Sequence, residues 1–295
     1  MNTQEINAPN NKISAKTRFS IVAVALVAFV GILAETSLNV TFPTLEKAFG
    51  IPLSTVQWVT TAYLLVVALV MPTSSNNSQR FQDRTLIFTE LIFFTVGEIL
   101  SLISPNFSIL MVGRLVQGIG RGSAIPLMFN MVLTKIPRAK VGVWMGFAGM
   151  ILSIAPALGP TYGGLLTGTL GWRMIFALIL IIPIIIFPLG MWAIENHKKE
   201  RPGQFDFIAF IFLSIAMTSA LLALDALGNP QLALIWLVVF ILSLIAFIWR
   251  SKTSNLHFID INVFKSQTFT LSVIVYCILK FANLGNNIII TNFMQ

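Results

Sequence analysis

Long apolar stretches, separated by short polar ones, follow one another along the whole chain. At least eight of them run for roughly 17 residues or more with almost no charge, and residues 21–40, 87–103 and 174–192 are the clearest. A helix rises ~1.5 Å per residue, so each stretch can cross a hydrocarbon core of ~30 Å. The pattern predicts a polytopic, all-α membrane protein with about nine transmembrane helices. We place them at residues 20–42, 57–77, 86–103, 109–133, 144–166, 174–192, 206–226, 232–249 and 268–290.

Composition supports the same class of protein. Hydrophobic residues make up 56% of the chain and charged residues only 10%, with a mean hydropathy of +0.85. The chain has too few polar residues to cover the surface of a water-soluble domain of this size. Cys277 is the single cysteine, so a disulfide within the chain is excluded.

The sequence lacks the patterns of metal, nucleotide and nucleophile chemistry. His197 and His257 both lie in predicted loops, and the chain has no Gly-Lys-Ser/Thr loop that would bind phosphate. A membrane-embedded enzyme would need nucleophiles or metal ligands clustered at membrane depth, and none cluster in the sequence. We therefore expect no cofactor, no metal site and no enzymatic activity.

Basic residues gather in alternate loops, and this distribution says more about the orientation and partners of the chain than its net charge of +8 does. One side of the predicted membrane carries only Lys47 and Arg173. The other side carries Lys12, Lys16, Arg18, Arg80, Arg84, Lys135, Arg138, Lys140, Lys198, Lys199, Arg201, Arg250, Lys252 and Lys265. This asymmetry is typical of cytoplasmic loops, so we expect a cytoplasmic N-terminus and no nucleic-acid partner.

Loop lengths and composition suggest how the chain is divided. We expect a cytoplasmic N-terminal tail at 1–19, a six-helix bundle at 20–194 and a charged cytoplasmic linker at 195–205. Two extra transmembrane helices follow at 206–250, and 251–295 forms a loop and the first helix of an incomplete C-terminal bundle. Transporters are usually built from repeated halves with the binding site between them. The facing half is therefore expected as a separate or continued chain.

The fourth predicted helix carries polar residues at helical spacing. Arg114 lies about six residues inside it, or ~9 Å along its axis, where a guanidinium must face the bundle or water and find a partner. Gln117 and Gly118 continue the same polar face, and Arg121 follows two turns after Arg114. The alternative is that Arg114 extends to the membrane interface and only its stem is buried.

The fifth predicted helix combines small residues and prolines. The set comprises Ala155, Pro156, Gly159, Pro160, Gly163 and Gly164. Ala155, Gly159 and Gly163 recur every four residues and form a flat stripe, which lets another helix backbone approach closely. Pro156 and Pro160 each remove a backbone donor and favour a bend. We interpret the six residues as a conformational hinge, and a plain packing face is the alternative.

Acidic residues also lie at membrane depth. Glu35 in the first helix is ~22 Å from a helix start near Ser20, and Asn39 follows one turn later. Because burial disfavours the charged form, Glu35 is our candidate proton-exchanging group. The alternative is a glutamate permanently paired with a buried arginine. Glu90, Glu98 and Lys280 are further charged residues inside helices; Glu98 either lies near the outer interface or pairs with an arginine.

Together these motifs resemble the major facilitator superfamily, in its 14-helix drug:proton antiporter branch. The family pattern R-x-x-Q-G-x-G is matched by Arg114, Gln117, Gly118 and Gly120. The antiporter signature G-x-x-x-G-P-x-x-G-G is matched by Ala155 (at its first glycine), Gly159, Pro160, Gly163 and Gly164. The resemblance implies the helical-bundle fold of that superfamily and a substrate cavity between two bundles.

The sequence departs from the family at two places. The first helix has Ala34 where the branch usually has aspartate, with Glu35 beside it, as in lincomycin-exporter-like members. The cytoplasmic loop pattern G-x-L-x-D-R-x-G-R-R keeps only Arg80 and Arg84, which we interpret as the remnant of a latch between helices.

The resulting hypothesis is proton-coupled efflux of amphipathic, drug-like compounds across a bacterial plasma membrane. Glu35 and Arg114 are the candidates for proton coupling. Asn39, Gln117, Gly118 and Arg121 would support the cavity or the coupling, with protons, the small-molecule substrate and the lipid bilayer as partners. The alternative is a non-transporting fragment of such a transporter.

Overall fold

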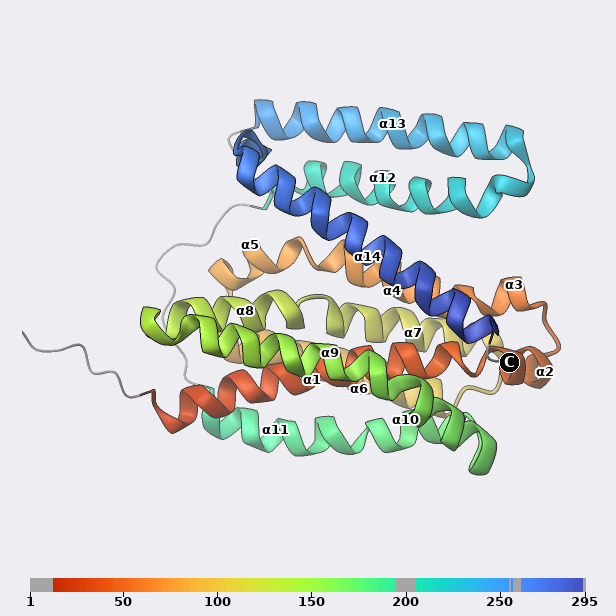
Figure 1. Cartoon of the computed structure of the whole chain (residues 1–295), viewed down its shortest axis with the longest axis horizontal. Helices are drawn as coiled ribbons and strands as arrows, with labels where there is room; N and C mark the ends of the chain where they lie inside the picture. The colour runs from red at the N-terminus through yellow and green to blue at the C-terminus, as the bar shows by residue number, and fades with distance from the viewer. Residues whose placement is uncertain (1–12, 195–204, 255, 257–260, 294–295) are drawn as a thin grey trace, which may run out of the picture. The chain divides into compact units, whose positions relative to one another are not determined.

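The computed structural model describes residues 13–194, 205–254, 256 and 261–293, and its regular elements within these ranges are all helical (Figure 1). Two compact units are formed by residues 1–204 and 205–295. The first unit contains α1 (Ala15–Asn39), α2 (Phe42–Phe49), α3 (Leu53–Val56), α4 (Trp58–Val70), α5 (Thr73–Arg80), α6 (Asp83–Leu102), α7 (Phe107–Gly122), α8 (Ala124–Lys135), α9 (Arg138–Thr169), α10 (Arg173–Ile179) and α11 (Ile181–Ala193). The second contains α12 (Phe207–Asp225), η1 (Ala226–Gly228), α13 (Pro230–Thr253), η2 (Ile261–Lys265) and α14 (Gln267–Phe293).

All nine predicted transmembrane stretches coincide with helical segments. Within the described residues, seven helices are long and apolar enough to cross a membrane by length and composition. The predicted stretch 109–133 is not among the seven because it breaks at Ser123 into α7 and α8. The stretch 268–290 lies in α14, of which the described apolar part is Gln267–Leu279. The all-helical membrane fold is therefore confirmed.

One predicted helix ends earlier than expected. The stretch 57–77 divides at Met71 and Pro72 into the apolar α4 and the polar α5, whose sequence is TSSNNSQR. Pro72 has no backbone N–H to donate to the preceding turn, and the residues after it are too polar for a hydrocarbon core. Most of the predicted linker, residues 195–204, lies outside the described residues, as do residues 1–12 of the predicted tail. The predicted division into five segments remains a prediction.

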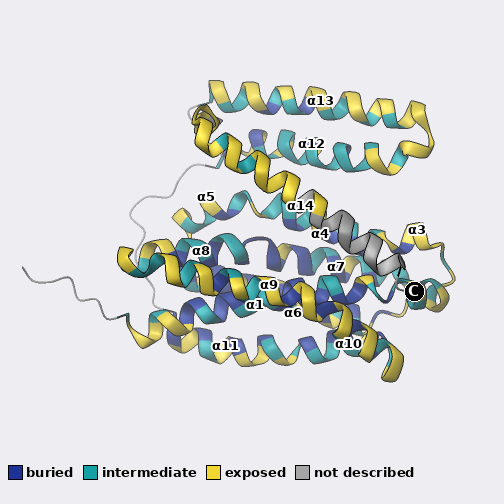
Figure 2. Cartoon of the chain, viewed as in Figure 1, coloured by how far each residue is buried: buried dark blue, intermediate teal, exposed yellow. Residues whose placement is uncertain are grey.

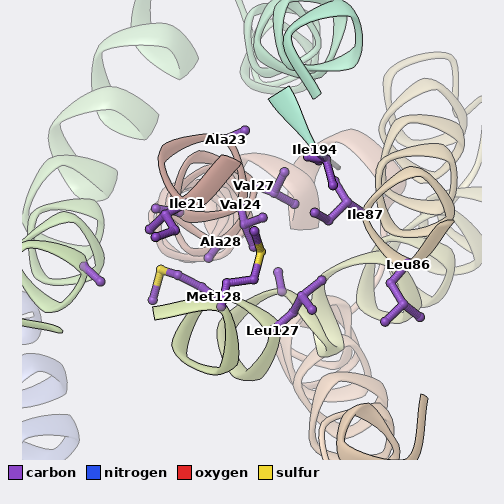
Figure 3. Packing of buried hydrophobic residues seen from close by; sticks show 14 of the residues in the cluster. Ile21, Ala23, Val24, Val27, Ala28, Leu86, Ile87, Leu127, Met128 and Ile194 are labelled. Atoms are coloured by element: carbon purple, nitrogen blue, oxygen red, sulfur yellow. The ribbon is translucent and has the colours of Figure 1, made fainter. Parts of the chain in front are cut away.

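Helix α1 is the most buried element of the first unit. Fourteen of its residues are buried, and it packs against α9, α11 and α8; in Figure 2 it is drawn largely in the buried colour. Figure 3 shows part of this contact, in which Val24 and Ala28 of α1 pack with Leu127 and Met128 of α8. Lipid is as apolar as this core, so close packing stabilises the contact more than exclusion of water does.

Helices α6 and α7 approach each other closely because glycines line their contact. A Cβ atom at Gly97 would lie 2.5 Å from the Gln117 backbone nitrogen, and one at Gly113 would lie 2.5 Å from Ser101 Oγ. Neither position has room for a side chain. This close contact fixes the rotation of α7 and therefore the direction in which its polar residues point.

In the second unit, α12 and α13 pack as a helix pair. Asp206 caps α12 by accepting a hydrogen bond from the Ala209 N–H at 3.1 Å, and it forms an ion pair with Arg250 of α13 at 3.1 Å. Burial raises the pKa of Asp206, but hydrogen bonds from Ala209, Ser254 and Arg250 and the Arg250 charge outweigh this effect. The pKa of Asp206 therefore lies below its ordinary value.

Candidate functional site

A buried ion pair joins α1 to α7. Arg121 Nη1 donates to Glu35 Oε2 at 2.5 Å, and the side chains are only 8% and 16% exposed, respectively. Glu35 therefore has a nearly buried arginine as its partner, an arrangement that both sequence-based interpretations of Glu35 allow. That partner is Arg121, which the sequence predicts only as a supporting residue, and not Arg114, the predicted proton-coupling candidate.

Tyr63 of α4 lies at the centre of the site and is missing from the residues predicted from sequence. Its hydroxyl donates to the Gly31 carbonyl of α1 at 3.0 Å and accepts a hydrogen bond from Arg121 Nη1 at 3.2 Å. Gly31 is required here because a Cβ atom would lie 2.6 Å from Arg121 Cδ. Three helices therefore meet around one guanidinium.

Arg114 is completely buried, which rules out the alternative that it reaches the membrane interface. Its guanidinium carbon lies 3.9 Å from the centroid of the Tyr63 ring, compared with 5.5 Å for Arg121. Arg114 Nη1 donates to Gln117 Oε1 at 2.5 Å, and Nε reaches the Val59 carbonyl at 3.4 Å. One aromatic ring thus contacts both cations, an attraction that strengthens when the cation is removed from water.

The other predicted polar residues of the site lie around this centre. Asn39 Oδ1, at the end of α1, accepts a hydrogen bond from Thr60 Oγ1 at 2.8 Å and so joins α1 to α4. Gly118 faces α4, where a Cβ atom would lie 3.0 Å from the Tyr63 carbonyl oxygen. Asn39 and Gly118 therefore hold α4, and with it Tyr63, against α1 and α7.

The small residues of α9 face α1, as the four-residue spacing indicates. Ala155, Gly159 and Gly163 are buried. A Cβ atom at Gly159 would overlap the Thr36 hydroxyl, and one at Gly163 would overlap the backbone of Ser37. Pro156, Pro160 and Gly164 lie on the opposite, exposed face, and α9 continues as one helix through both prolines. At these glycines α9 meets Thr36 and Ser37 of α1, the two residues that follow Glu35.

The two arginines of the loop remnant have different surroundings. Arg80 is exposed at the end of α5, and the Arg84 guanidinium lies 5.8 Å from the centroid of the Phe88 ring. Nearby, Lys135 of α8 and Asp83 of α6 form an ion pair at 2.8 Å. The side chain of Lys280 lies outside the described residues.

Among the described residues, no group of three or more His, Cys, Asp or Glu side chains is placed to hold a metal ion. What the described residues do bring together is one carboxylate, two guanidinium groups and one phenol, contributed by α1, α4 and α7. All are buried or nearly so.

Comparison of the chain with known proteins identifies its family. The family model of the Major Facilitator Superfamily matches residues 24–294. The chain belongs to that superfamily. A relative from Listeria monocytogenes named lincomycin resistance protein LmrB is 33% identical over 279 residues, which cover 93% of this chain and 59% of the relative. The protein of the same name from Bacillus subtilis is 31% identical over 281 residues, with the same two coverages.

More distant relatives are also transport or resistance proteins by name. A putative multidrug resistance protein MdtD from an Enterobacter species is 27% identical, over 90% of this chain and 56% of the relative. Among solved structures, the transporter PepTSo of the POT family superposes with a TM-score of 0.57 at 14% identity, over 82% of this chain and 55% of that chain. That likeness concerns the fold alone. The chain spans somewhat more than half of the length of these relatives.

Proposed function

We propose that this chain exports amphipathic, drug-like compounds in exchange for protons by alternating access. The buried pair between Glu35 and Arg121 is the observation that carries the proposal. Removing one member of such a pair leaves an unpaired charge in a low-dielectric site, at a cost of about 3–5 kcal/mol. Protonation of Glu35 removes its charge in the same way, so it weakens the contact between α1 and α7.

Tyr63 and Arg114 would pass this change on within the first unit. When Glu35 is protonated, Arg121 loses the negative charge opposite its guanidinium, and its hydrogen bond to the Tyr63 hydroxyl remains. Tyr63 also contacts Arg114 through its ring. A movement of Arg121 therefore changes the surroundings of Arg114, and a proton bound at Glu35 biases the packing of α1, α4 and α7 together. Such a bias between two arrangements is what coupling requires.

The contact between α1 and α9 is our candidate for the moving surface. Gly159 and Gly163 leave α1 a smooth face directly after Glu35. Two backbones in contact without interlocking side chains slide or tilt at low cost. We therefore assign the hinge to Ala155, Gly159 and Gly163, with Pro156 and Pro160 reducing the backbone hydrogen bonding of α9 nearby.

We propose that the N-terminus lies in the cytoplasm of a bacterial cell and the chain in its plasma membrane, and the basic residues of alternate loops support this orientation. The names of the relatives support a drug-type substrate, and lincomycin is the first compound to test. Such transporters bind substrate between two bundles, so the facing bundle would come from a continued or separate chain.

Drug efflux in a drug-sensitive, efflux-deficient bacterial host tests the proposal. We expect resistance to lincomycin that is lost when the proton gradient is collapsed, and lost in Glu35→Gln at equal protein abundance. Resistance that survives both changes would contradict proton coupling at Glu35. The alternative of a non-transporting fragment is favoured by no observation of the fold, and a correctly inserted protein without any efflux would support it.

A further inference from the structure

A second acidic residue is buried in α6, away from the ion pair between Glu35 and Arg121. The Glu98 side chain has no exposed surface. Neither of its two carboxyl oxygens has a hydrogen-bond partner among the described residues. A buried carboxyl without a partner is normally a large cost, so its position needs an explanation.

The surroundings of Glu98 contain one positive charge. Arg114 of α7 lies close enough to interact with it electrostatically, and so does the Tyr162 phenol of α9. The Tyr162 hydroxyl already donates to the Ile175 carbonyl at 3.1 Å. In α10 the titratable residue is Arg173, whose guanidinium donates to the Ser104 carbonyl at 2.8 Å. Helix α11 contains no titratable residue.

Two buried side chains of α7 have donors without a hydrogen-bond partner. Arg114 Nη2 and Gln117 Nε2 are buried and have no hydrogen-bond partner within the described part of the chain. Their neighbours in the same two side chains, Arg114 Nη1 and Gln117 Oε1, bond to each other. In this arrangement a charged Glu98 would have no hydrogen bond, so Glu98 is present as the neutral acid. Pairing of a charged Glu98 with these donors would require the Glu98 and Arg114 side chains to move toward each other.

We propose that Glu98 is a second proton-exchanging group of this bundle, alternating between a buried neutral acid and a carboxylate paired with Arg114. This inference rests on the proposed proton coupling and extends it to a second carboxyl. In the step itself the Glu98 O–H bond breaks, its electron pair stays on the carboxylate and the proton passes to water. The carboxylate then accepts a hydrogen bond from Arg114 Nη2, so no charge remains unpaired.

A route for the proton runs along α6. Ser101 and Ser104 follow Glu98 at intervals of three residues, and both are completely buried. Their hydroxyls donate to the carbonyls of Gly97 and Ser101, each at 2.8 Å. A hydroxyl is both donor and acceptor, so each serine is a candidate relay group for a proton that moves along the ~9 Å between Glu98 and Ser104, just beyond the end of α6 at Leu102.

Infrared difference spectroscopy on the purified 295-residue chain in lipid vesicles tests the inference without requiring transport. The carbonyl band of a protonated carboxyl is assigned to Glu98 by comparison with Glu98→Gln. We expect this band at acidic pH, its loss as the pH is raised, and a band that titrates again in Glu98→Asp. In Arg114→Gln we expect the band to persist at every pH tested, because the partner of the carboxylate is gone.

Glu90 is the matched control. It is buried on the same helix, and both of its oxygens also lack partners among the described residues. We expect its band to remain unchanged across the pH range, and Glu90→Gln to leave the Glu98 band titrating. A Glu98 band that is constant over the whole range, or absent at acidic pH, overturns the inference whether or not the protein transports drug. A titrating Glu98 band in a protein without drug efflux supports the inference and contradicts the proposed function instead.

Discussion

Adding one methyl group to α9 tests the close contact between α9 and α1. Gly163→Ala places a Cβ atom on the backbone of Ser37, where no flexible side chain can move away. Gly164→Ala is the matched control, because a Cβ atom there meets nothing within 4 Å. Both variants gain about 0.8–1 kcal/mol of helix propensity when glycine becomes alanine, so this gain cancels in the comparison.

The difference between the two variants therefore measures the steric conflict alone. Inserting a methyl group into a well-packed contact costs about 1–3 kcal/mol. We expect Gly163→Ala to be less stable than Gly164→Ala by that amount, and Gly164→Ala to equal or exceed the unmodified chain. Unfolding of the purified protein in detergent by increasing fractions of sodium dodecyl sulfate measures both. Equal stability of the two variants would show that α9 and α1 are not in backbone contact at Gly163.

Three further predictions concern Glu35, Arg114 and Asp206. Glu35→Gln should destabilise the chain by about 3–5 kcal/mol because Arg121 is left unpaired, and Glu35→Gln combined with Arg121→Met should recover much of that loss in the same unfolding assay. Arg114→Lys should lose efflux at normal abundance, because an ammonium cannot both stack on Tyr63 and hold Gln117 as a planar guanidinium does; normal efflux would exclude that role. Asp206 has a lowered pKa in the folded state, so its contribution to stability is present above its unfolded pKa and is lost as the pH falls below about 4. Asp206→Asn should therefore reduce the acid sensitivity of the pairing between α12 and α13, and an unchanged acid profile would contradict this.

The fold could be predicted largely from the sequence because membrane spans leave a strong local signal. Length and hydropathy alone located the nine helical stretches. The stripe of Gly159 and Gly163 was also predictable, because residues four apart share one face of a helix whatever the helix packs against. The break at Ser123 was not, since it interrupts a stretch that is continuous in hydropathy.

The partners within the site could not be predicted in the same way. Helical spacing places Arg114 and Arg121 on one face, but it does not say which of them reaches the level of Glu35 on α1. That depends on how far α7 is shifted along α1, which is set by contacts such as Arg121 over Gly31. Tyr63 was missed because a single aromatic residue in an apolar helix has no sequence signal that separates it from a packing residue.

Proton movement driven by a drug gradient tests the central claim most directly. Purified chain would be placed in vesicles loaded with lincomycin and containing a pH-sensitive dye, and then diluted into drug-free buffer. Drug leaving the vesicles should drive protons inward, so we predict that the lumen becomes acidic, and that it does not in Glu35→Gln. A lumen that stays at constant pH while lincomycin leaves through the protein would contradict proton-coupled export by this chain.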